Sequence, residues 1–231
     1  MEWDGQDRLK QEAACLGVDM IESGMVIGLG SGSTVRYVLE EIGNRIVSGL
    51  LRDITGIPSS LQTERLAQKL GIPLTNLNLE PEIDLTIDGA DEVGPALSLI
   101  KGGGGALLRE KILMEASRIN VIIVDENKLS AELGTNWPVP VEVVPLARQP
   151  VWDFLVSLGA RISSRENEDE SFFRTDQQNI ILDASFGPIA RPEHLATRLS
   201  RRAGIIEHGL FLGLATEIIV AGKKGVWRIK E

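Results

Sequence analysis

The chain has 231 residues, of which 43% are hydrophobic and 25% charged, as in an ordinary globular protein that can bury a sizeable core. Its net charge of −9 argues against nucleic acid and anionic membrane surfaces as partners, although a few lysines can still form a local site for a small anion. No apolar run approaches the ~20 residues of a membrane span, so no membrane association is expected. The single cysteine, Cys15, and a start without a signal peptide predict a reducing, cytoplasmic setting.

The first half of the chain alternates apolar strand-like runs with helical repeats. This alternation predicts a parallel sheet covered by helices, in which ligands bind at the carboxyl ends of the strands. Strands are predicted over 25–29, 53–58, 72–77, 83–87 and 120–124, and helices over 8–16, 35–46, 61–70 and 106–117.

A loop rich in glycine and hydroxyl groups follows the first predicted strand, with the sequence GSGST at 30–34. The start of the next helix offers free N–H groups, and the hydroxyls of Ser31, Ser33 and Thr34 suit phosphate oxygens. The loop lacks the lysine of a P-loop, and its match to a dinucleotide fingerprint is weak because the third glycine is missing. Alternatively, Ser33 simply caps the helix, a role compatible with phosphate binding.

Three acidic residues fall within the five-residue stretch 88–92, which reads DGADE and follows the strand over 83–87. A polar turn is one interpretation. In the functional interpretation Asp88 and Asp91 face the same cavity as Lys101, where two carboxylates and a lysine hold sugar hydroxyls and move protons. A metal site is not expected, because the two histidines of the chain lie far away in sequence.

The stretch 101–111, KGGGGALLREK, is the most unusual part of the chain. Four consecutive glycines bury nothing and cost backbone entropy, so they indicate close approach of the backbone to a ligand. They join the end of a buried strand at 99–100 to the helix over 106–117, which favours an anion beside Lys101. Glu110 then lies about one turn into the helix, where a carboxylate suits proton transfer. The alternative is a flexible loop followed by a solvated charged helix face.

Two further lysines are candidates. Lys128 lies just past the carboxyl end of the strand over 120–124, which favours a role in the site over that of an ordinary surface lysine. Lys10 points off the first helix, where a solvated charge is the stronger interpretation from the residues alone.

The character of the chain changes at Trp137, where prolines cluster. The order strand, helix, strand, strand, helix, strand predicts a small α+β unit of the ferredoxin-like kind. Its strands are predicted over 139–144, 160–165, 172–175, 180–184 and 205–214, with 172–175 and 180–184 joined by a short turn, and its helices over 150–158 and 192–202. A last hairpin, with strands over 217–222 and 226–230, turns at 222–225.

Three motifs together resemble those of ribose-5-phosphate isomerase, type A: GLGSGST at 28–34, DGADE at 88–92, and KGGG at 101–104 followed by REK at 109–111. The resemblance runs over nearly the whole chain, including VPVEV at 139–143. It implies interconversion of D-ribose 5-phosphate and D-ribulose 5-phosphate through an enediolate, in the non-oxidative branch of the pentose phosphate pathway. It also implies no metal or redox cofactor and a homo-oligomer, either a dimer or a tetramer.

The same resemblance implies a role for individual residues. Glu110 matches the catalytic base, and Asp88, Asp91 and Lys101 would assist ring opening and proton movement. The implied substrate-binding residues are Ser31, Gly32, Ser33, Thr34, Asp88, Gly89, Ala90, Asp91, Lys101, Gly102, Gly103, Gly104, Lys128 and, more loosely, Lys10. Two positions depart from the family: Ser31 replaces the usual threonine and keeps the hydroxyl, and Gly105 replaces the usual alanine, which would loosen the loop.

The predicted fold is therefore α/β: a Rossmann-like, mainly parallel sheet domain over 1–136 and 210–231, with a smaller ferredoxin-like α+β domain over 137–209. One alternative function is a non-catalytic sugar-phosphate-sensing domain. Such a regulator would need a DNA-binding module, and about twenty-four residues before the first strand are too few for one. The other alternative, a nicotinamide-dependent dehydrogenase, lacks the full glycine fingerprint. The expected partner is a phosphorylated pentose.

Overall fold

The computed structural model describes residues 5–230, which form two compact units. The first unit contains the residues up to Ala90, Arg109–Lys128 and the residues from Leu214 onward, and the second contains Asp91–Leu108 and Leu129–Gly213. The chain start at 1–4, where no signal peptide is expected, lies outside the described residues. No helix within 5–230 is long and apolar enough to cross a membrane.

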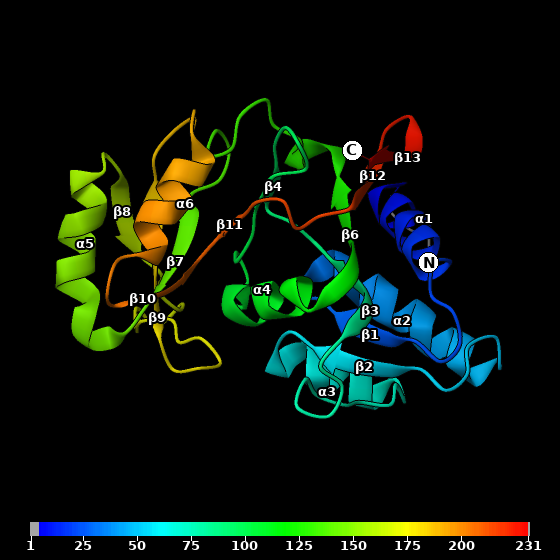
Figure 1. Ribbon diagram of the computed structural model, residues 1–231. Helices are drawn as coiled ribbons and strands as arrows, with labels where there is room; N and C mark the ends of the chain where they lie inside the picture. Colours follow the sequence, from blue (N-terminus) through cyan, green and yellow to red (C-terminus); the bar gives the residue numbers. More distant parts are fainter. Residues whose placement is uncertain (1–4, 231) are drawn as a thin grey trace. The chain divides into compact units, whose positions relative to one another are not determined.

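A six-stranded sheet forms the centre of the first unit, in the order β13-β12-β6-β3-β1-β2 (Figure 1). All neighbouring strands are parallel except β12 and β13, which form the C-terminal hairpin. The mainly parallel sheet is therefore confirmed, and the hairpin completes it. The strands are β1 (Val26–Leu29), β2 (Thr55–Pro58), β3 (Ile83–Asp88), β6 (Ser117–Asp125), β12 (Glu217–Gly222) and β13 (Gly225–Lys230).

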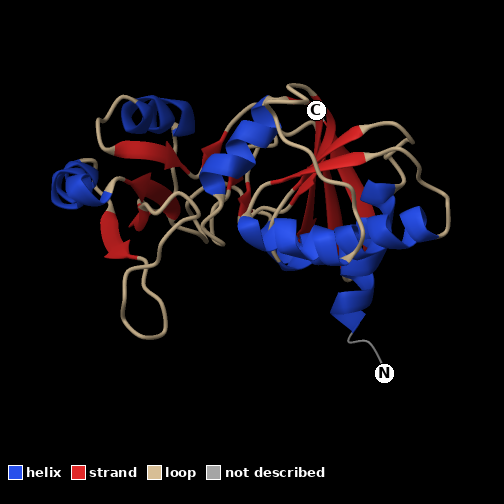
Figure 2. Cartoon of the chain, turned by 90° about the horizontal axis from the view of Figure 1, so that it is seen from below, coloured by secondary structure: helices blue, strands red, loops and turns tan. Residues whose placement is uncertain are grey.

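Helices pack along one side of this sheet (Figure 2). Buried side chains of the strands, such as Ile27, Leu85 and Ile219, share one apolar cluster with Ala13 and Ile42 from two helices. Each buried aliphatic side chain contributes roughly 1.5–3 kcal/mol by leaving water, so this cluster holds the helices on the sheet. The helices are α1 (Gly5–Val18), α2 (Ser33–Val47) and α3 (Leu61–Lys69), while α4 (Leu107–Glu115) leads into β6, which is followed by the 3₁₀ turn η1 (Glu126–Lys128).

The strand predicted over 72–77 does not form. Only Leu74 bridges to the sheet, opposite Gly56 of β2. Pro73 has no N–H to donate to a neighbouring strand, and the chain turns directly afterwards, where the N–H of Leu79 donates to the carbonyl of Asn76 at 3.0 Å. The run therefore lies at the edge of the sheet with a single bridge, and only Ile72 within it is buried.

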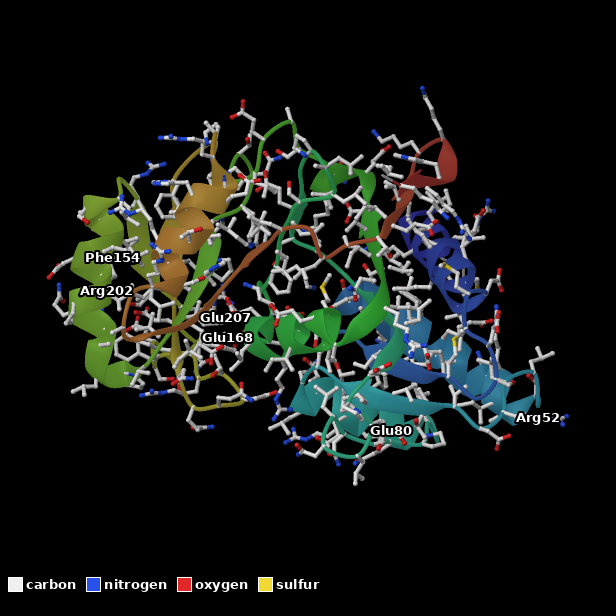
Figure 3. The ribbon with its side chains drawn as sticks, in the orientation of Figure 1. Arg52, Glu80, Phe154, Glu168, Arg202 and Glu207 are labelled. Carbon is white, nitrogen blue, oxygen red and sulfur yellow. The ribbon has the colours of Figure 1, made fainter. Side chains whose placement is uncertain are left out.

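The second unit contains a four-stranded antiparallel sheet in the order β10-β7-β9-β8. Its elements follow the predicted ferredoxin-like succession: β7 (Val139–Val143), α5 (Arg148–Ser157), β8 (Arg161–Ser164), β9 (Ile180–Ser185), α6 (Pro192–Ser200) and β10 (Ile205–His208), with a 3₁₀ turn η2 (Pro145–Ala147) before α5. The helix α5 and the turn after α6 meet where the Arg202 guanidinium lies over the ring of Phe154, 5.2 Å from its centroid (Figure 3).

Two predictions in this unit are wrong. Residues 172–175 form no strand, because Phe172 makes only an isolated bridge to Glu166 and the chain then closes a turn from Thr175 to Asn179. The strand predicted over 205–214 is divided at Gly209, whose N–H donates to the carbonyl of Pro140 at 2.7 Å. The part before Gly209 is β10, and the part after it is β11 (Leu210–Phe211).

This division creates a third, small sheet in the order β11-β5-β4, with β5 (Leu99–Ile100) and β4 (Glu92–Val93). Because β11 pairs with β5, residues 91–108 belong to the second compact unit. The units therefore have other bounds than the predicted domains, 1–136 plus 210–231 and 137–209.

Candidate active site

The first glycine loop joins β1 to α2 in the first unit. Gly32 is the N-cap residue of α2, with a φ of 103° that favours glycine, and no side chain caps the helix. Ser33 is therefore the first helical residue, and the alternative that it caps the helix is wrong. Gly32 and Ser33 are exposed, so the first turn of α2 offers backbone N–H groups and a hydroxyl to an anion.

Asp88 lies at the carboxyl end of β3 with only 1% of its surface exposed. Its Oδ1 accepts hydrogen bonds from the N–H groups of Gly89 at 2.7 Å and Ser31 at 3.0 Å. Gly30 makes this approach possible, because a Cβ at that position would overlap the Asp88 carboxylate. The close approach of β3 therefore explains why position 30 is a glycine, and no bound dinucleotide is needed to account for it.

The hydroxyl of Ser31 lies in a cluster that the sequence analysis missed. Its Oγ is 2.7 Å from Ser59 Oγ, 3.0 Å from Ser60 Oγ and 3.2 Å from Thr63 Oγ1, where β2 ends and α3 begins. Thr63 also donates to the carbonyl of Gly30 at 2.8 Å, so the cluster holds the first glycine loop in place. The sequence signal for this hydroxyl cluster was the pair of serines, Ser59 and Ser60, directly after β2.

The two further lysines lie in the first unit. Lys128 ends η1 and is half-buried. Lys10 on α1 lines a cavity of about 450 Å³ together with Asp125 at the end of β6, Asn127 in η1 and Lys223 in the C-terminal hairpin. Lys10 is half-buried and shares a cavity with the segment that leads into Lys128.

Glu110 lies in the first turn of α4, where the positive end of the helix dipole favours a carboxylate. It is 5% exposed, and Lys111 beside it is also buried, whereas the apolar Ile112 is exposed. The alternative of a solvated charged face is therefore wrong for these two residues. Burying a charged side chain is costly unless an ion pair or hydrogen bonds compensate it, so the surroundings of this turn are arranged for charged groups.

The second glycine loop, at 102–105, follows β5 in the second unit. Lys101 is 2% exposed, its N–H donates to the carbonyl of Gly209 at 2.9 Å, and its Nζ lies 5.6 Å from the centroid of the Phe211 ring. Asp91 holds the loop directly, because its Oδ2 accepts from the N–H of Gly103 at 2.7 Å.

Gly105 does not loosen this loop, contrary to the expectation. Its φ is +82°, and a Cβ there would overlap the ring of Phe173. Glycine at this position instead allows tight packing.

Among residues 5–230, no three side chains of the His, Cys, Asp and Glu types come together as metal ligands.

These features define a class of protein: an α/β protein with two glycine loops at strand ends, an exposed helix N-terminus, and buried carboxylates and a buried lysine next to the loops. A family model described as ribose 5-phosphate isomerase A (phosphoriboisomerase A) matches residues 55–225. The chain belongs to the ribose 5-phosphate isomerase A family, as the resemblance of its motifs implied.

Individual relatives agree with this assignment. A ribose-5-phosphate isomerase A from Desulfatibacillum aliphaticivorans is 53% identical over 225 residues, covering 97% of this chain and 98% of the relative. One from Chloroflexus aurantiacus is 52% identical over 220 residues, covering 95% and 92%. Among solved structures, a D-ribose-5-phosphate isomerase in complex with phospho-erythronic acid has a TM-score of 0.96 and 37% identity, covering 99% of this chain and 100% of that one. The Plasmodium falciparum ribose 5-phosphate isomerase has a TM-score of 0.94 and 40% identity, covering 97% and 99%.

Proposed function

We propose that this protein interconverts D-ribose 5-phosphate and D-ribulose 5-phosphate, with Glu110 as the general base. The observation that carries the proposal is the burial of Glu110 in the first turn of α4, directly after the KGGGG loop. Membership of the isomerase family supports the reaction, and its relatives carry that name over nearly their full length. The non-catalytic sensor has no comparable support.

The reaction moves a proton between two neighbouring carbons of the sugar. The C2 proton of the open-chain aldose lies next to the carbonyl and is weakly acidic, so its removal needs a positioned base and stabilisation of the enediolate oxygens. In the proposal the Glu110 carboxylate takes this proton and returns it to C1. The ammonium group of Lys101 and the N–H groups of Gly102–Gly104 stabilise the oxygens as negative charge develops.

The remaining roles concern ring opening and binding. We assign Asp88 and Asp91, with Lys101, to opening of the furanose and to the movement of the hydroxyl proton from O2 to O1 as the aldose becomes the ketose. The phosphate is assigned to Ser31–Thr34 and the first turn of α2, with support from Lys128 and Lys10, because helix N-termini and lysines favour phosphate. Gly89 and Ala90 complete the substrate-binding set.

The first test is turnover of ribose 5-phosphate with a chelator present, comparing wild type with Glu110→Gln. Glutamine keeps the size of the side chain and removes the base, so a loss of about 10²–10⁴-fold or more is expected. Glu115→Gln, an exposed carboxylate on the same helix, is the matched control and should retain activity. Turnover that survives Glu110→Gln removes Glu110 from its role, and binding without turnover in the wild type favours the sensor.

The same assay separates ring opening from isomerisation. Asp88→Asn and Asp91→Asn should reduce turnover of the furanose more than that of the open-chain sugar. Equal losses on both forms would contradict the assignment of these carboxylates.

The setting of the enzyme is also part of the proposal. We infer a cytoplasmic homo-oligomer, a dimer or a tetramer, because the resemblance implies such an assembly and the only cysteine, Cys15, forms no disulfide. Sedimentation of the purified protein tests the assembly, and a monomer would contradict it.

A further inference from the structure

Arg165 directly follows β8 and contacts the second glycine loop within the second unit. Its Nη1 donates hydrogen bonds to the carbonyl oxygens of Gly102 at 2.7 Å and Gly103 at 2.9 Å. These contacts join residues about sixty positions apart in the chain. Arg165 is thus the side chain that ties the glycine loop to the ferredoxin-like sheet.

The guanidinium is itself held in a fixed orientation. Its Nε and Nη2 donate to the two carboxylate oxygens of Asp183 on β9, at 3.0 and 2.5 Å. Both side chains are mostly buried, with 15% and 16% of their surfaces exposed, so their charges compensate each other where water is scarce. The Phe173 ring lies 5.9 Å from the guanidinium carbon and also packs against Gly105.

The peptide group between Gly102 and Gly103 is held from two opposite sides. Its C=O accepts from Arg165, and its N–H donates to Asp91 Oδ2 at 2.7 Å. The next peptide group has its C=O, that of Gly103, on the same arginine. All described peptide bonds are trans, so the N–H of Gly104 points to the side opposite Arg165. Gly104 is exposed, and no atom lies within 4 Å of the place a Cβ would occupy.

We propose that Arg165, held by Asp183, is a positioning residue for the isomerase reaction, which orients the peptide groups of Gly102–Gly104 so that the Gly104 N–H faces the substrate. This inference rests on the proposed function. A run of four glycines has little conformational preference of its own, so an external clamp decides its geometry. Preorganised N–H donors stabilise developing charge only when they are already oriented before the reaction.

The clamp requires arginine. Two carbonyl oxygens and both oxygens of a carboxylate are bound by one planar fork of N–H groups, which the ammonium group of lysine does not reproduce. Arg165→Lys therefore keeps the charge and loses the geometry.

The test measures kcat and KM for ribose 5-phosphate in Arg165→Lys, Arg165→Met and Asp183→Asn. Misplaced catalytic groups cost up to about 10²-fold, so we expect kcat to fall about 10–100-fold in both arginine variants, and KM to change less. Asp183→Asn frees the arginine without removing it and should give a smaller loss in kcat. Hydrogen exchange of the peptide covering 101–106 should be faster in all three variants.

Arg148→Met is the matched control. Arg148 lies in the same unit, is also half-buried, and stacks over the Phe172 ring, 5.0 Å from its centroid, but it donates a hydrogen bond to Ser164 and not to the loop. We expect it to leave kcat and exchange at 101–106 close to wild type, even where thermal stability falls.

Three outcomes would overturn the proposal: unchanged kcat in folded Arg165→Met, restoration of full kcat by lysine, or equal effects of Arg148→Met on kcat and on exchange at 101–106. If Arg165→Met does not fold, Asp183→Asn and Arg165→Lys decide the question by the same readouts. If the wild type does not turn over ribose 5-phosphate, the proposed function fails, and exchange at 101–106 still shows whether Arg165 orders the loop.

Discussion

At the scale of single residues, Glu142 shows how β7 accommodates a buried carboxylate. The residue is fully buried, and its Oε1 accepts from Thr175 Oγ1 at 2.8 Å and Asn179 Nδ2 at 2.9 Å. Burial raises the pKa of Glu142, the two hydrogen bonds oppose this, and the negative charges of Glu207 and Asp176 raise the pKa further. The ionised form of Glu142 is therefore less favoured in the folded protein than in the unfolded chain.

This shift predicts a pH dependence of stability. Because the pKa is higher in the folded than in the unfolded state, the folded protein binds more protons between the two values, and the free energy of unfolding falls as pH rises through that window. Below the unfolded pKa this cost disappears. Chemical denaturation of wild type and Glu142→Gln at a series of pH values should show a wild-type curve that declines relative to the variant as pH rises above the ordinary range of a glutamic acid. Parallel curves would contradict the prediction.

At the scale of elements, the second glycine loop and the segment after β8 fit one another closely. Gly105 combines a φ of +82° with contact to the Phe173 ring, and Gly102 has a φ of +101°. An alanine at 105 would therefore be strained at this φ and would also overlap the Phe173 ring.

Gly105→Ala should therefore destabilise the protein by about 1–3 kcal/mol, because a side chain at positive φ is strained and would also overlap Phe173. The double variant Gly105→Ala/Phe173→Leu should recover part of this loss relative to Phe173→Leu alone. Urea denaturation of the four proteins in the cycle measures the coupling. Additive effects would show that the ring does not select glycine at 105.

At the scale of the whole molecule, the C-terminal hairpin completes a sheet that begins near residue 26. Strand β12 pairs in parallel with β6, with Ile219 opposite Ile123, and the Ile219 side chain is fully buried in the main core. The stability of the first unit therefore depends on its last residues.

Ile219→Ala should lower the free energy of unfolding by about 2–5 kcal/mol, the usual cost of deleting a large buried aliphatic side chain. Leu146→Ala is the control, since Leu146 is 94% exposed, and its effect should stay within about 0.5 kcal/mol. Denaturant melts monitored by circular dichroism measure both. Similar values for the two variants would mean that the hairpin contributes little to the core.

Most of the sheet strands and the two glycine loops were predictable because both signals are local, whereas the order of the strands in the sheet was not. A buried strand shows as a short apolar run, and a glycine loop shows as an interruption that packing does not explain. The succession of elements in the ferredoxin-like unit was predictable for the same reason.

Other features depend on partners far away in sequence. The strands β4 and β11 have two residues each, too few for any periodicity, and each exists because it pairs with β5, the strand expected at 99–100. The strand predicted over 72–77 had a suitable apolar pattern, but Pro73 and the turn after it limit the pairing to one bridge. The sequence pattern of α4 could not predict that Glu110 is buried and Ile112 exposed, because burial depends on which segments pack against the helix.

By itself, the sequence determined the α/β class, the family, and the identity of Glu110, Asp88, Asp91 and Lys101 as candidates, because motif spacing and residue chemistry are properties of the chain alone. Only the tertiary structure decided the bounds of the two compact units, the hydroxyl cluster around Ser31, and the clamp of Arg165 on the glycine loop. The physical reason is that these features are contacts between segments distant in sequence, and such contacts are settled when the strands pair and the core closes.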